Sequence, residues 1–243
     1  MDLQEHIQGL RLHVLDMARM SQRSVDYSIK ACALGSAELC CSVRDRTFEI
    51  DALRCEITET VEVLLTRSIP RDADFRFVFA SERIGRALET LHQHAVEIAG
   101  QCLQLLEVGR RPAWAAIGAI GDTVNSLVRL CVVALFEEDK QHAQAALSAG
   151  RVERSFETTF CDWFRTLDPT ARARAQCERA IVTHLSSMAR ATYDIADALE
   201  FWLEDNDNEP RSRIAKRRPA LASEGIQAQG PGDCPLRPNA FIF

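Results

Sequence analysis

Apolar residues recur at alternating intervals of three and four positions along most of the chain, the spacing that gives a helix one buried face. The strict alternation typical of strands is not seen. The pattern predicts six long helices, whose apolar series start at Leu3, Ile50, Leu88, Ile117, Val152 and Val182. The last two helices are expected to span 139–167 and 170–204. The sequence therefore predicts an all-α fold of long antiparallel helices packed as bundles.

Prolines and glycines supply the expected helix boundaries. A proline fits the first turn of a helix but breaks its interior, so Pro70, Pro112 and Pro169 should mark helix starts. Glycine commonly ends a helix because it adopts the left-handed conformation without strain. The ends or kinks expected on this ground are at Gly35, Gly109 and Gly150.

The two halves of the chain repeat a common pattern. Each reads as helix, short loop, helix, proline, helix, and "EIA" at 97–99 is echoed by "DIA" at 194–196. Such self-similarity indicates a tandem repeat. We expect one three-helix bundle in residues 1–108 and a second in residues 112–205. Residues 206–243 are rich in Pro, Gly and polar residues with no period, and we expect a disordered tail.

Charge and composition narrow the classes of partner. The chain of 243 residues has a net charge of −6. Six basic and four acidic side chains give the tail +2, so the helical body carries −8. Nucleic acid is therefore not expected as the main partner, because phosphate backbones require a basic surface. The nine cysteines include no CxxC pair, which indicates free thiols in a reducing compartment.

The sequence predicts a cytoplasmic protein that meets membranes only indirectly, through its partners. The start "MDLQEHIQGL" has neither the basic nor the apolar region of a signal peptide. The most apolar stretch, "LVRLCVVALF" at 127–136, is too short to span a bilayer and carries Arg129. We therefore expect no transmembrane helix.

The stretch "EITETVEVLLTRSIPRDADFRFVFASERIGRALETLHQHAVEIA" (56–99) resembles the first repeat of the PhoU family of phosphate-signalling regulators. The family pattern P-x-x-x-D-L-R is matched by Pro70, Asp74, Phe75 and Arg76. Residues 117–203 resemble the second repeat more faintly, mainly through "IADALEFW" at 195–202. The resemblance implies two tandem three-helix bundles.

Many PhoU proteins hold multinuclear iron or zinc clusters through carboxylates spaced four residues apart, and the resemblance shows where those ligands would fall. The positions are Thr47 and Asp51, Glu89 and Gln93, Ala149 and Glu153, and Ser186 and Arg190. Only Asp51, Glu89 and Glu153 keep an acid, and Arg190 would repel a metal ion. We therefore predict no metal cofactor, with these three acids as degraded remnants.

His92 follows Glu89 by three residues, as in the E-x-x-H motif of di-iron bundles. Such sites need two of these pairs and further carboxylates, and only one pair is present. The alternative is a solvated or hydrogen-bonded pair on the helix surface. A stoichiometric transition metal in protein purified without chelators would refute the prediction that the clusters are lost.

Asp74 and Arg76 are candidates for structural or partner-binding roles. Asp74 lies near the positive N-terminal end of its helix, and Arg76 should pair with a carboxylate of the same or a neighbouring helix. No nucleophile–base constellation and no glycine-rich phosphate loop is present, so we do not expect an enzyme.

By the resemblance, the chain is expected to be a regulatory adaptor of phosphate uptake and phosphate-starvation signalling. Its partners would be a phosphate-transport ABC ATPase and a sensor histidine kinase, whose output it would hold down. The alternative is a helical interaction module that has kept the fold, lost the metal and serves another partner. The long exposed helix faces are also compatible with a homodimer.

Overall fold

The computed structural model describes residues 3–66, 71–149 and 153–204. These residues form helices and contain no strand, which confirms the all-α prediction for the described part of the chain. The helices are α1 (Leu3–Leu34), α2 (Ala37–Arg44), α3 (Thr47–Leu65), α4 (Asp72–Glu107), α5 (Trp114–Glu137), α6 (Lys140–Ala149), α7 (Glu153–Thr166), α8 (Pro169–Arg174) and α9 (Gln176–Leu203). The predicted tail, 206–243, lies outside the described residues.

The glycine-based predictions of helix ends are confirmed where they can be seen. Gly35 and Gly109 have positive φ values of 65° and 70°. Gly35 directly follows α1, and Gly109 lies two residues after the end of α4. The Gly35 amide donates to Ala31 O and the Gly109 amide to Leu106 O, both in the last turn of the helix. Gly150 lies outside the described residues.

The prolines mark helix starts with different accuracy. Pro169 is the first residue of α8, and the side chain of Asp168 caps that helix by accepting a bond from the Ala171 amide. Pro112 lies just before α5, which begins two residues later at Trp114. Pro70 lies outside the described residues, and α4 begins at Asp72.

The six predicted helices are subdivided in three places. A short helix, α2, follows α1, and its first turn is capped by the Ser36 hydroxyl, which accepts from the Leu39 amide. The predicted span 139–167 consists of α6 and α7. The predicted span 170–204 is interrupted at Ala175, whose amide bonds both Ala171 O and Arg172 O between α8 and α9. The break at Ala175 carries no glycine or proline, so the sequence pattern did not reveal it.

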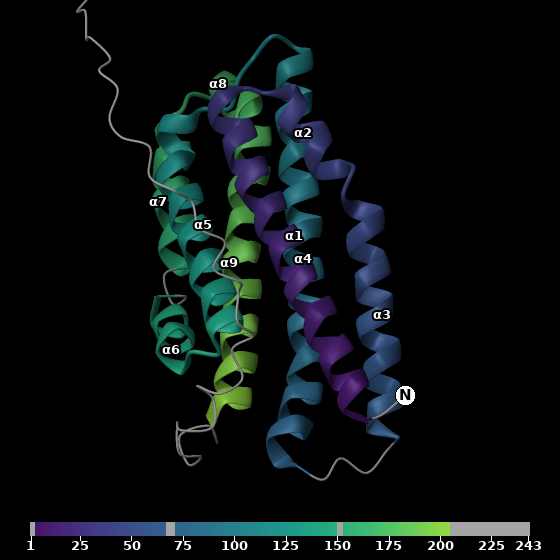
Figure 1. The fold of residues 1–243 in the computed structure, drawn as a ribbon. Coiled ribbons are helices and arrows are strands. Elements are labelled where there is room, and N and C mark those ends of the chain that lie inside the picture. The colour runs from purple at the N-terminus through teal and green to yellow at the C-terminus, as the bar shows by residue number, and fades with distance from the viewer. Residues whose placement is uncertain (1–2, 67–70, 150–152, 205–243) are drawn as a thin grey trace, which may run out of the picture. The chain divides into compact units, whose positions relative to one another are not determined.

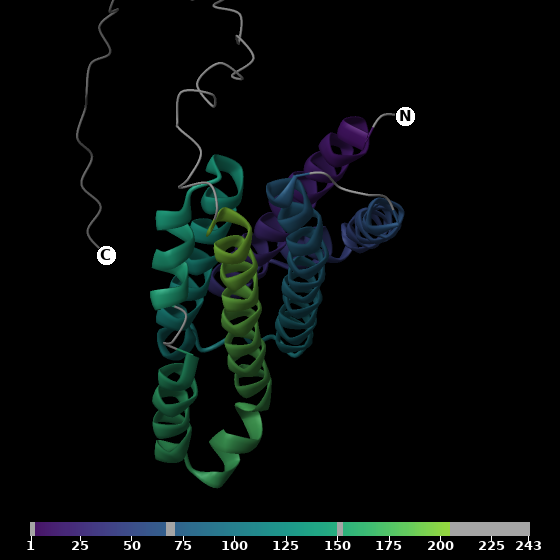
Figure 2. The ribbon, with the colours of Figure 1, turned by 90° about the horizontal axis from the view of Figure 1, so that it is seen from below.

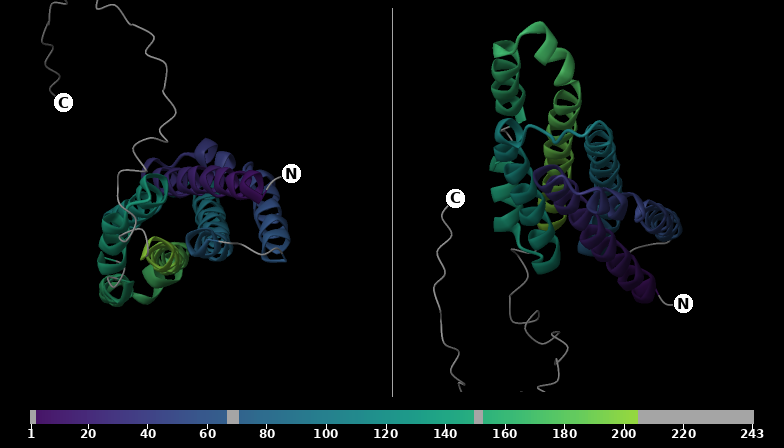
Figure 3. Two further views of the ribbon diagram at one scale, coloured as in Figure 1. Left: turned by 60° about the horizontal axis from the view of Figure 1, so that its bottom comes forward. Right: turned by 90° about the horizontal axis from the view of Figure 1, so that it is seen from above.

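Helices α4 and α9 lie side by side along most of their length and connect the two halves of the sequence (Figures 1 and 2). On one side of this pair, α1 and α3 pack on α4, and on the other side α5, α6 and α7 pack on α9 (Figure 3). The division into bundles at 1–108 and 112–205 stays a prediction, because α4 and α9 pack closely across it.

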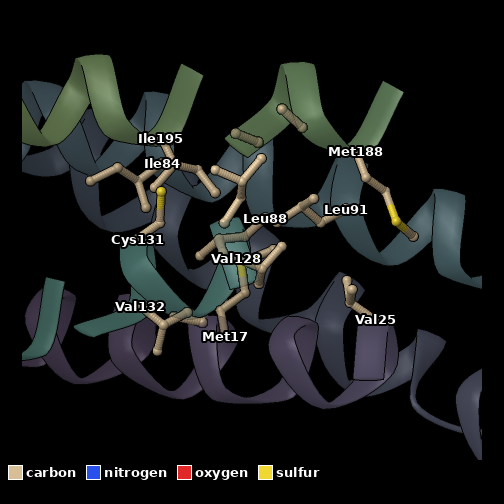
Figure 4. Close-up of a cluster of buried hydrophobic side chains, with 14 of the residues drawn as sticks. Met17, Val25, Ile84, Leu88, Leu91, Val128, Cys131, Val132, Met188 and Ile195 are labelled. Carbon is tan, nitrogen blue, oxygen red and sulfur yellow. The ribbon is translucent and has the colours of Figure 1, made fainter. Parts of the chain in front are cut away.

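The hydrophobic core is shared by helices from both halves. Figure 4 shows Met17 and Val25 of α1, Ile84, Leu88 and Leu91 of α4, Val128, Cys131 and Val132 of α5, and Met188 and Ile195 of α9 in one cluster. All ten side chains are buried. Each buried aliphatic side chain contributes about 1.5–3 kcal/mol of transfer free energy, so this cluster fixes α4 and α9 in place.

Helix α5 is long and apolar enough to cross a membrane by length and composition. Its segment Ile117–Glu137 has a mean hydropathy of 1.6, although half of this apolar window is buried inside the protein. Ile117, Val124 and Val128 have no exposed surface. The buried side of α5 packs inside the protein, as the buried side of a core helix does.

Candidate functional site

The positions that the PhoU resemblance assigns to metal ligands in the first half lie on α3 and α4, which pack against each other. Thr47 and Asp51 are on α3, and Glu89 and Gln93 are on α4. Asp51 and Gln93 are exposed, whereas Glu89 is partly buried. We call the charged part of this surface, formed by Arg54 of α3 with Glu82 and Glu89 of α4, the carboxylate face.

Arg54 bridges the two glutamates of the carboxylate face. Its Nη2 lies 2.5 Å from Glu82 Oε1 and its Nη1 lies 3.0 Å from Glu82 Oε2, a bidentate pair. Its Nε lies 3.4 Å from Glu89 Oε2. The Arg54 side chain is only 13% exposed. Planar guanidinium groups suit this arrangement because their donors form a rigid fork.

The electrostatics of the carboxylate face follow from this contact. Burial alone would lower the pKa of Arg54, but bonds to Glu82 and the charges of Glu82 and Glu89 raise it. Burial alone would raise the pKa of Glu82, but bonds from Arg54 and Arg86 lower it. Arg54 and Glu82 therefore both keep their charges at neutral pH and neutralise each other.

A glycine of α4 gives Arg54 room to lie between the helices. A Cβ atom at Gly85 would lie 3.3 Å from Ile57 Cγ2 and 3.7 Å from Arg54 Nη1. The first distance is tight, so a Cβ atom at this position would require the Ile57 side chain to shift by a few tenths of an ångström. Gly85 therefore supports the close approach that places Arg54 against the carboxylates.

His92 does not lie at the surface with Glu89, as the hydrogen-bonded surface pair would require. Its ring is 1% exposed and lies between α1 and α3. Nδ1 is 3.0 Å from Ser24 Oγ and Nε2 is 3.1 Å from Thr47 Oγ1, so both ring nitrogens have partners. Burial lowers the pKa of His92, and the charge of Asp51 opposes this effect. His92 thus joins three helices as a neutral, hydrogen-bonded core residue.

The residues present on the carboxylate face do not fit a multinuclear metal cluster. Thr47 and Gln93 carry no charge, and Glu89 already pairs with Arg54. Iron and zinc clusters require several deprotonated ligands directed at one point. The guanidinium of Arg54 supplies positive charge to this face, as a bound cation would.

The corresponding positions of the second half are also unsuited to a metal. Ser186 is buried on α9 and Arg190 is exposed one turn later. Ala149 ends α6 and Glu153 begins α7. Arg190 is basic, and Ser186 and Ala149 carry no negative charge. These three positions therefore cannot bind a cluster of metal cations.

Asp74 and Arg76 contact different neighbours near the start of α4. Asp74 Oδ2 accepts a bond from Gln4 Nε2 of α1 at 3.3 Å. Arg76 lies 3.4 Å from the carboxylate of Glu204, the C-cap residue of α9, and donates to Phe201 O at 3.3 Å. Its guanidinium also lies over the Phe201 ring, 5.3 Å from the centroid. Both residues tie α4 to adjacent helices, and Arg76 does so across the two halves.

Further pairs join α4 to α9, and we call this set the α4–α9 interface. Phe77 packs on Trp202 with centroids 4.9 Å apart, and Arg83 Nη2 lies 2.5 Å from Asp197 Oδ2. Near the middle of the two helices, His94 Nδ1 lies 3.2 Å from His184 Nδ1.

Sequence reasoning missed Arg54 and His184. Arg54 is three residues after Asp51 on the polar side of α3, and its partner Glu82 is distant in sequence. His184 faces His94 only because α4 and α9 run antiparallel in one particular register. Neither pairing produces a signal in a single sequence.

One further group of potential ligands lies at the junction of α5 and α6. Carboxylate oxygens of Glu137 and Asp139 and a ring nitrogen of His142 lie within 4.8 Å of one another. Asp139 Oδ1 already accepts the Gln141 amide at 2.7 Å, and Oδ2 lies 2.9 Å from His142 Nδ1. These bonds begin α6 and explain why the pKa of Asp139 is lowered, first by the Gln141 amide and then by His142. The group acts as a helix cap.

Comparisons with known proteins agree with the fold. Residues 14–101 match the family model of the PhoU domain. The structure is similar to PhoU from Pseudomonas aeruginosa, with a TM-score of 0.78 and 21% identity over 84% of this chain and 99% of that one. It is also similar to the phosphate transport system regulatory protein PhoU from Streptococcus pneumoniae, with a TM-score of 0.69 and 18% identity over 84% and 98% of the two chains.

No curated protein sequence matches the chain significantly. The domain match, the α3–α4 motif positions and the arrangement of the long helices nevertheless agree with one another. Residues 14–101 therefore match the PhoU domain, and the fold of the described chain is similar to that of PhoU proteins.

Proposed function

We propose that the chain is a cytoplasmic regulatory adaptor in phosphate transport and phosphate-starvation signalling, which acts through contacts with other proteins. The observation that carries this proposal is the similarity of fold along 84% of the chain to a phosphate transport system regulatory protein. The PhoU domain match over residues 14–101 supports it.

A phosphate-transport ABC ATPase and a sensor histidine kinase are the partners implied by the resemblance. Binding would use helix faces, and the acidic helical body would favour partner surfaces of positive charge. A homodimer would use the same kind of surface.

An apolar surface at the start of α4 is suited to such contacts. Phe75 and Phe79 lie one turn apart and are 46% and 47% exposed. Phe79 packs edge-on against Phe201 of α9, with ring centroids 5.7 Å apart. Aromatic residues are enriched at the centres of protein interfaces because they bury large areas with little loss of conformational freedom.

The carboxylate face favours a second candidate function, that of an interaction module outside phosphate signalling. Arg54 neutralises Glu82 and Glu89, so this chain differs from metal-binding relatives at the position where their clusters lie. A chain freed from metal binding could keep the fold and change its partner.

The test is affinity purification of the tagged protein from cells grown in high and in low phosphate. The expected result is recovery of a transporter ATPase or a sensor kinase in amounts that change with phosphate. Deletion of the gene should also derepress phosphate-starvation genes. Recovery of an unrelated protein, with no effect of phosphate, would contradict the adaptor proposal and favour the second candidate.

A double variant and its control test whether partners bind the apolar surface at the start of α4. The double variant Phe75→Ser, Phe79→Ser should reduce partner recovery at least about tenfold, as expected for the loss of interface anchors. Phe48→Ser is the matched control, because Phe48 is 82% exposed on α3. Equal recovery with all variants would exclude the start of α4 as the contact surface.

A further inference from the structure

Two histidines face each other in the middle of the α4–α9 interface. His94 of α4 and His184 of α9 have ring centroids 5.3 Å apart and ring planes inclined at 43°. Their Nδ1 atoms are separated by 3.2 Å. Both side chains are partly buried, so the pair keeps some contact with solvent. None of the family's carboxylate positions includes either residue.

The protonation of this pair favours ligands for a cation. Burial lowers the pKa of both histidines, and the proximity of His184 lowers that of His94 further. Two neutral imidazoles therefore face each other at neutral pH. Neutral imidazole nitrogen is the form that binds zinc and other borderline metals.

The distance between the two nitrogens matches that of a chelating pair. Zinc–nitrogen bonds of about 2.0–2.1 Å with tetrahedral angles place two ligand nitrogens about 3.3 Å apart. The observed separation of 3.2 Å is nearly the same. The buried residues Leu91 and Ala95 of α4 and Leu185 and Met188 of α9 flank the pair and fix both backbones. The geometry is therefore set by packing before any ion binds.

A carboxylate stands near both rings. Glu97 is exposed on α4, three residues after His94. Its negative charge acts on both histidines and raises the pKa of each against the effect of burial. An exposed glutamate can change rotamer at small cost, so Glu97 can supply a third ligand, with water completing the coordination.

The other candidate cation sites in the described residues are already occupied by protein groups. Arg54 neutralises Glu82 and Glu89, and Asp139 caps α6. The His94–His184 pair has no such cation or cap. Its two Nδ1 atoms share one hydrogen bond, which a metal ion bound to both nitrogens would replace. We propose that His94 and His184, with Glu97, form a zinc-binding site that clamps α4 to α9 and so joins the two halves of the protein.

The proposal makes the stability of the protein depend on zinc. An ion that binds the folded chain raises its stability by an amount that grows with ion concentration relative to Kd. Because the two ligands come from different halves, zinc would strengthen the contact between them. The proposal does not depend on phosphate signalling, and its test uses purified protein alone.

The experiment is calorimetric titration of the full-length, chelator-treated protein with zinc chloride at pH 7.5, in the presence of a thiol-free reductant, together with thermal melts. The expected result is one high-affinity equivalent and an increase of Tm with zinc. His94→Gln and His184→Gln should each weaken that affinity more than about tenfold, because even partners of metal ligands contribute roughly 10–100-fold.

Controls separate this site from the others. His142→Gln, at the junction of α5 and α6, should leave the affinity unchanged. His184→Cys supplies another zinc ligand and should retain binding where His184→Gln does not, which excludes a folding defect as the cause. The proposal is overturned if the wild type binds no zinc, if both glutamine variants bind as the wild type does, or if blocking the exposed cysteines abolishes binding.

Discussion

Helix α4 packs against α3 on one side and against α9 on another, and the two contacts use different kinds of side chain. On the carboxylate face it meets α3 through Arg54, Glu82 and Glu89, a network of full charges. At the α4–α9 interface it meets α9 through buried aliphatic side chains and through rings, Phe77 on Trp202 and His94 opposite His184. The α3 side contains a positively charged side chain, Arg54, whereas the α9 side places two neutral imidazole rings opposite each other.

This difference shows how acidic side chains on adjacent helices can be neutralised by a group of the chain itself. Acids gathered on adjacent helices repel one another unless a cation lies between them. In this chain the guanidinium of Arg54 from α3 is that cation. Arg54 reaches both glutamates from a position that is 13% exposed, which supports the packing of α3 on α4.

The largest effect is expected from truncation of the aromatic contact. Trp202 is 4% exposed and packs on Phe77, with the guanidinium of Arg11 5.4 Å from its ring centroid. Trp202→Ala should lower the free energy of unfolding by about 3–5 kcal/mol, as for other buried aromatic residues. Urea denaturation measures this. Tyr193→Ala, at an exposed position of the same helix, should change it by less than about 0.5 kcal/mol.

A smaller effect is expected at the buried histidine beside the carboxylate face. His92→Leu leaves the hydroxyls of Ser24 and Thr47 without their ring partners. Loss of such buried bonds should cost about 1–3 kcal/mol. Urea denaturation of this variant against Thr90→Leu, a control on the same helix, checks the value. A cost no larger than that of the control would show that the His92 bonds contribute nothing.

The pH dependence of stability should distinguish the two sides of α4. The pKa values of His94 and His184 are lowered in the folded state, first by burial. As the pH falls, the unfolded chain therefore takes up protons at a higher pH than the folded chain does. The stability that these histidines contribute is fully present above a pH of about 6.5 and is lost as the pH falls toward their folded-state pKa values. Denaturation midpoints at pH 7.5 and pH 5.5 measure the loss.

The double variant His94→Gln, His184→Gln should lose less stability over this pH range than the wild type. Glu97, whose charge opposes the effect of burial on both rings, is retained in this comparison. His92 also has a lowered pKa and keeps its contribution, set by burial and by the charges of Asp51 and Arg46. An unchanged pH dependence would show that the facing pair is protonated equally in both states.

The smallest effect is expected from the solvent-exposed ion pair of the α4–α9 interface. Arg83 and Asp197 are 39% and 46% exposed. Exposed pairs contribute about 0–1 kcal/mol, and salt weakens them. Arg83→Ala should therefore shift the urea midpoint only slightly, and the shift should vanish in high salt. A large, salt-independent loss would mean that this side of α4 also depends on charge.

Sequence reasoning predicted the helical fold well because it depends on local signals. The spacing of apolar residues identified the long helices, and Gly35, Gly109 and Pro169 marked three of their boundaries. The break at Ala175 was missed because no glycine or proline accompanies it. The division of the chain into two bundles stays a prediction.

The candidate site was predicted less well, because it depends on contacts between helices. The motif placed its ligand positions on α3 and α4, but it assigned no role to Arg54. Glu89 and His92 are one turn apart in sequence, yet one faces Arg54 and the other is buried against α1. The rotation of α4 between its neighbours decides this, and a single sequence does not reveal it.

The central claim is that Arg54 neutralises Glu82 and Glu89 in place of a bound cation. Its most direct test is urea denaturation of the wild type, of Arg54→Met and of the triple variant Arg54→Met, Glu82→Gln, Glu89→Gln. The account predicts that Arg54→Met lowers the free energy of unfolding by about 1–3 kcal/mol, because two partly buried acids lose their partner. The triple variant should recover most of this loss, since the acids are then neutral as well. Wild-type stability in Arg54→Met, or a further loss in the triple variant, would contradict the claim.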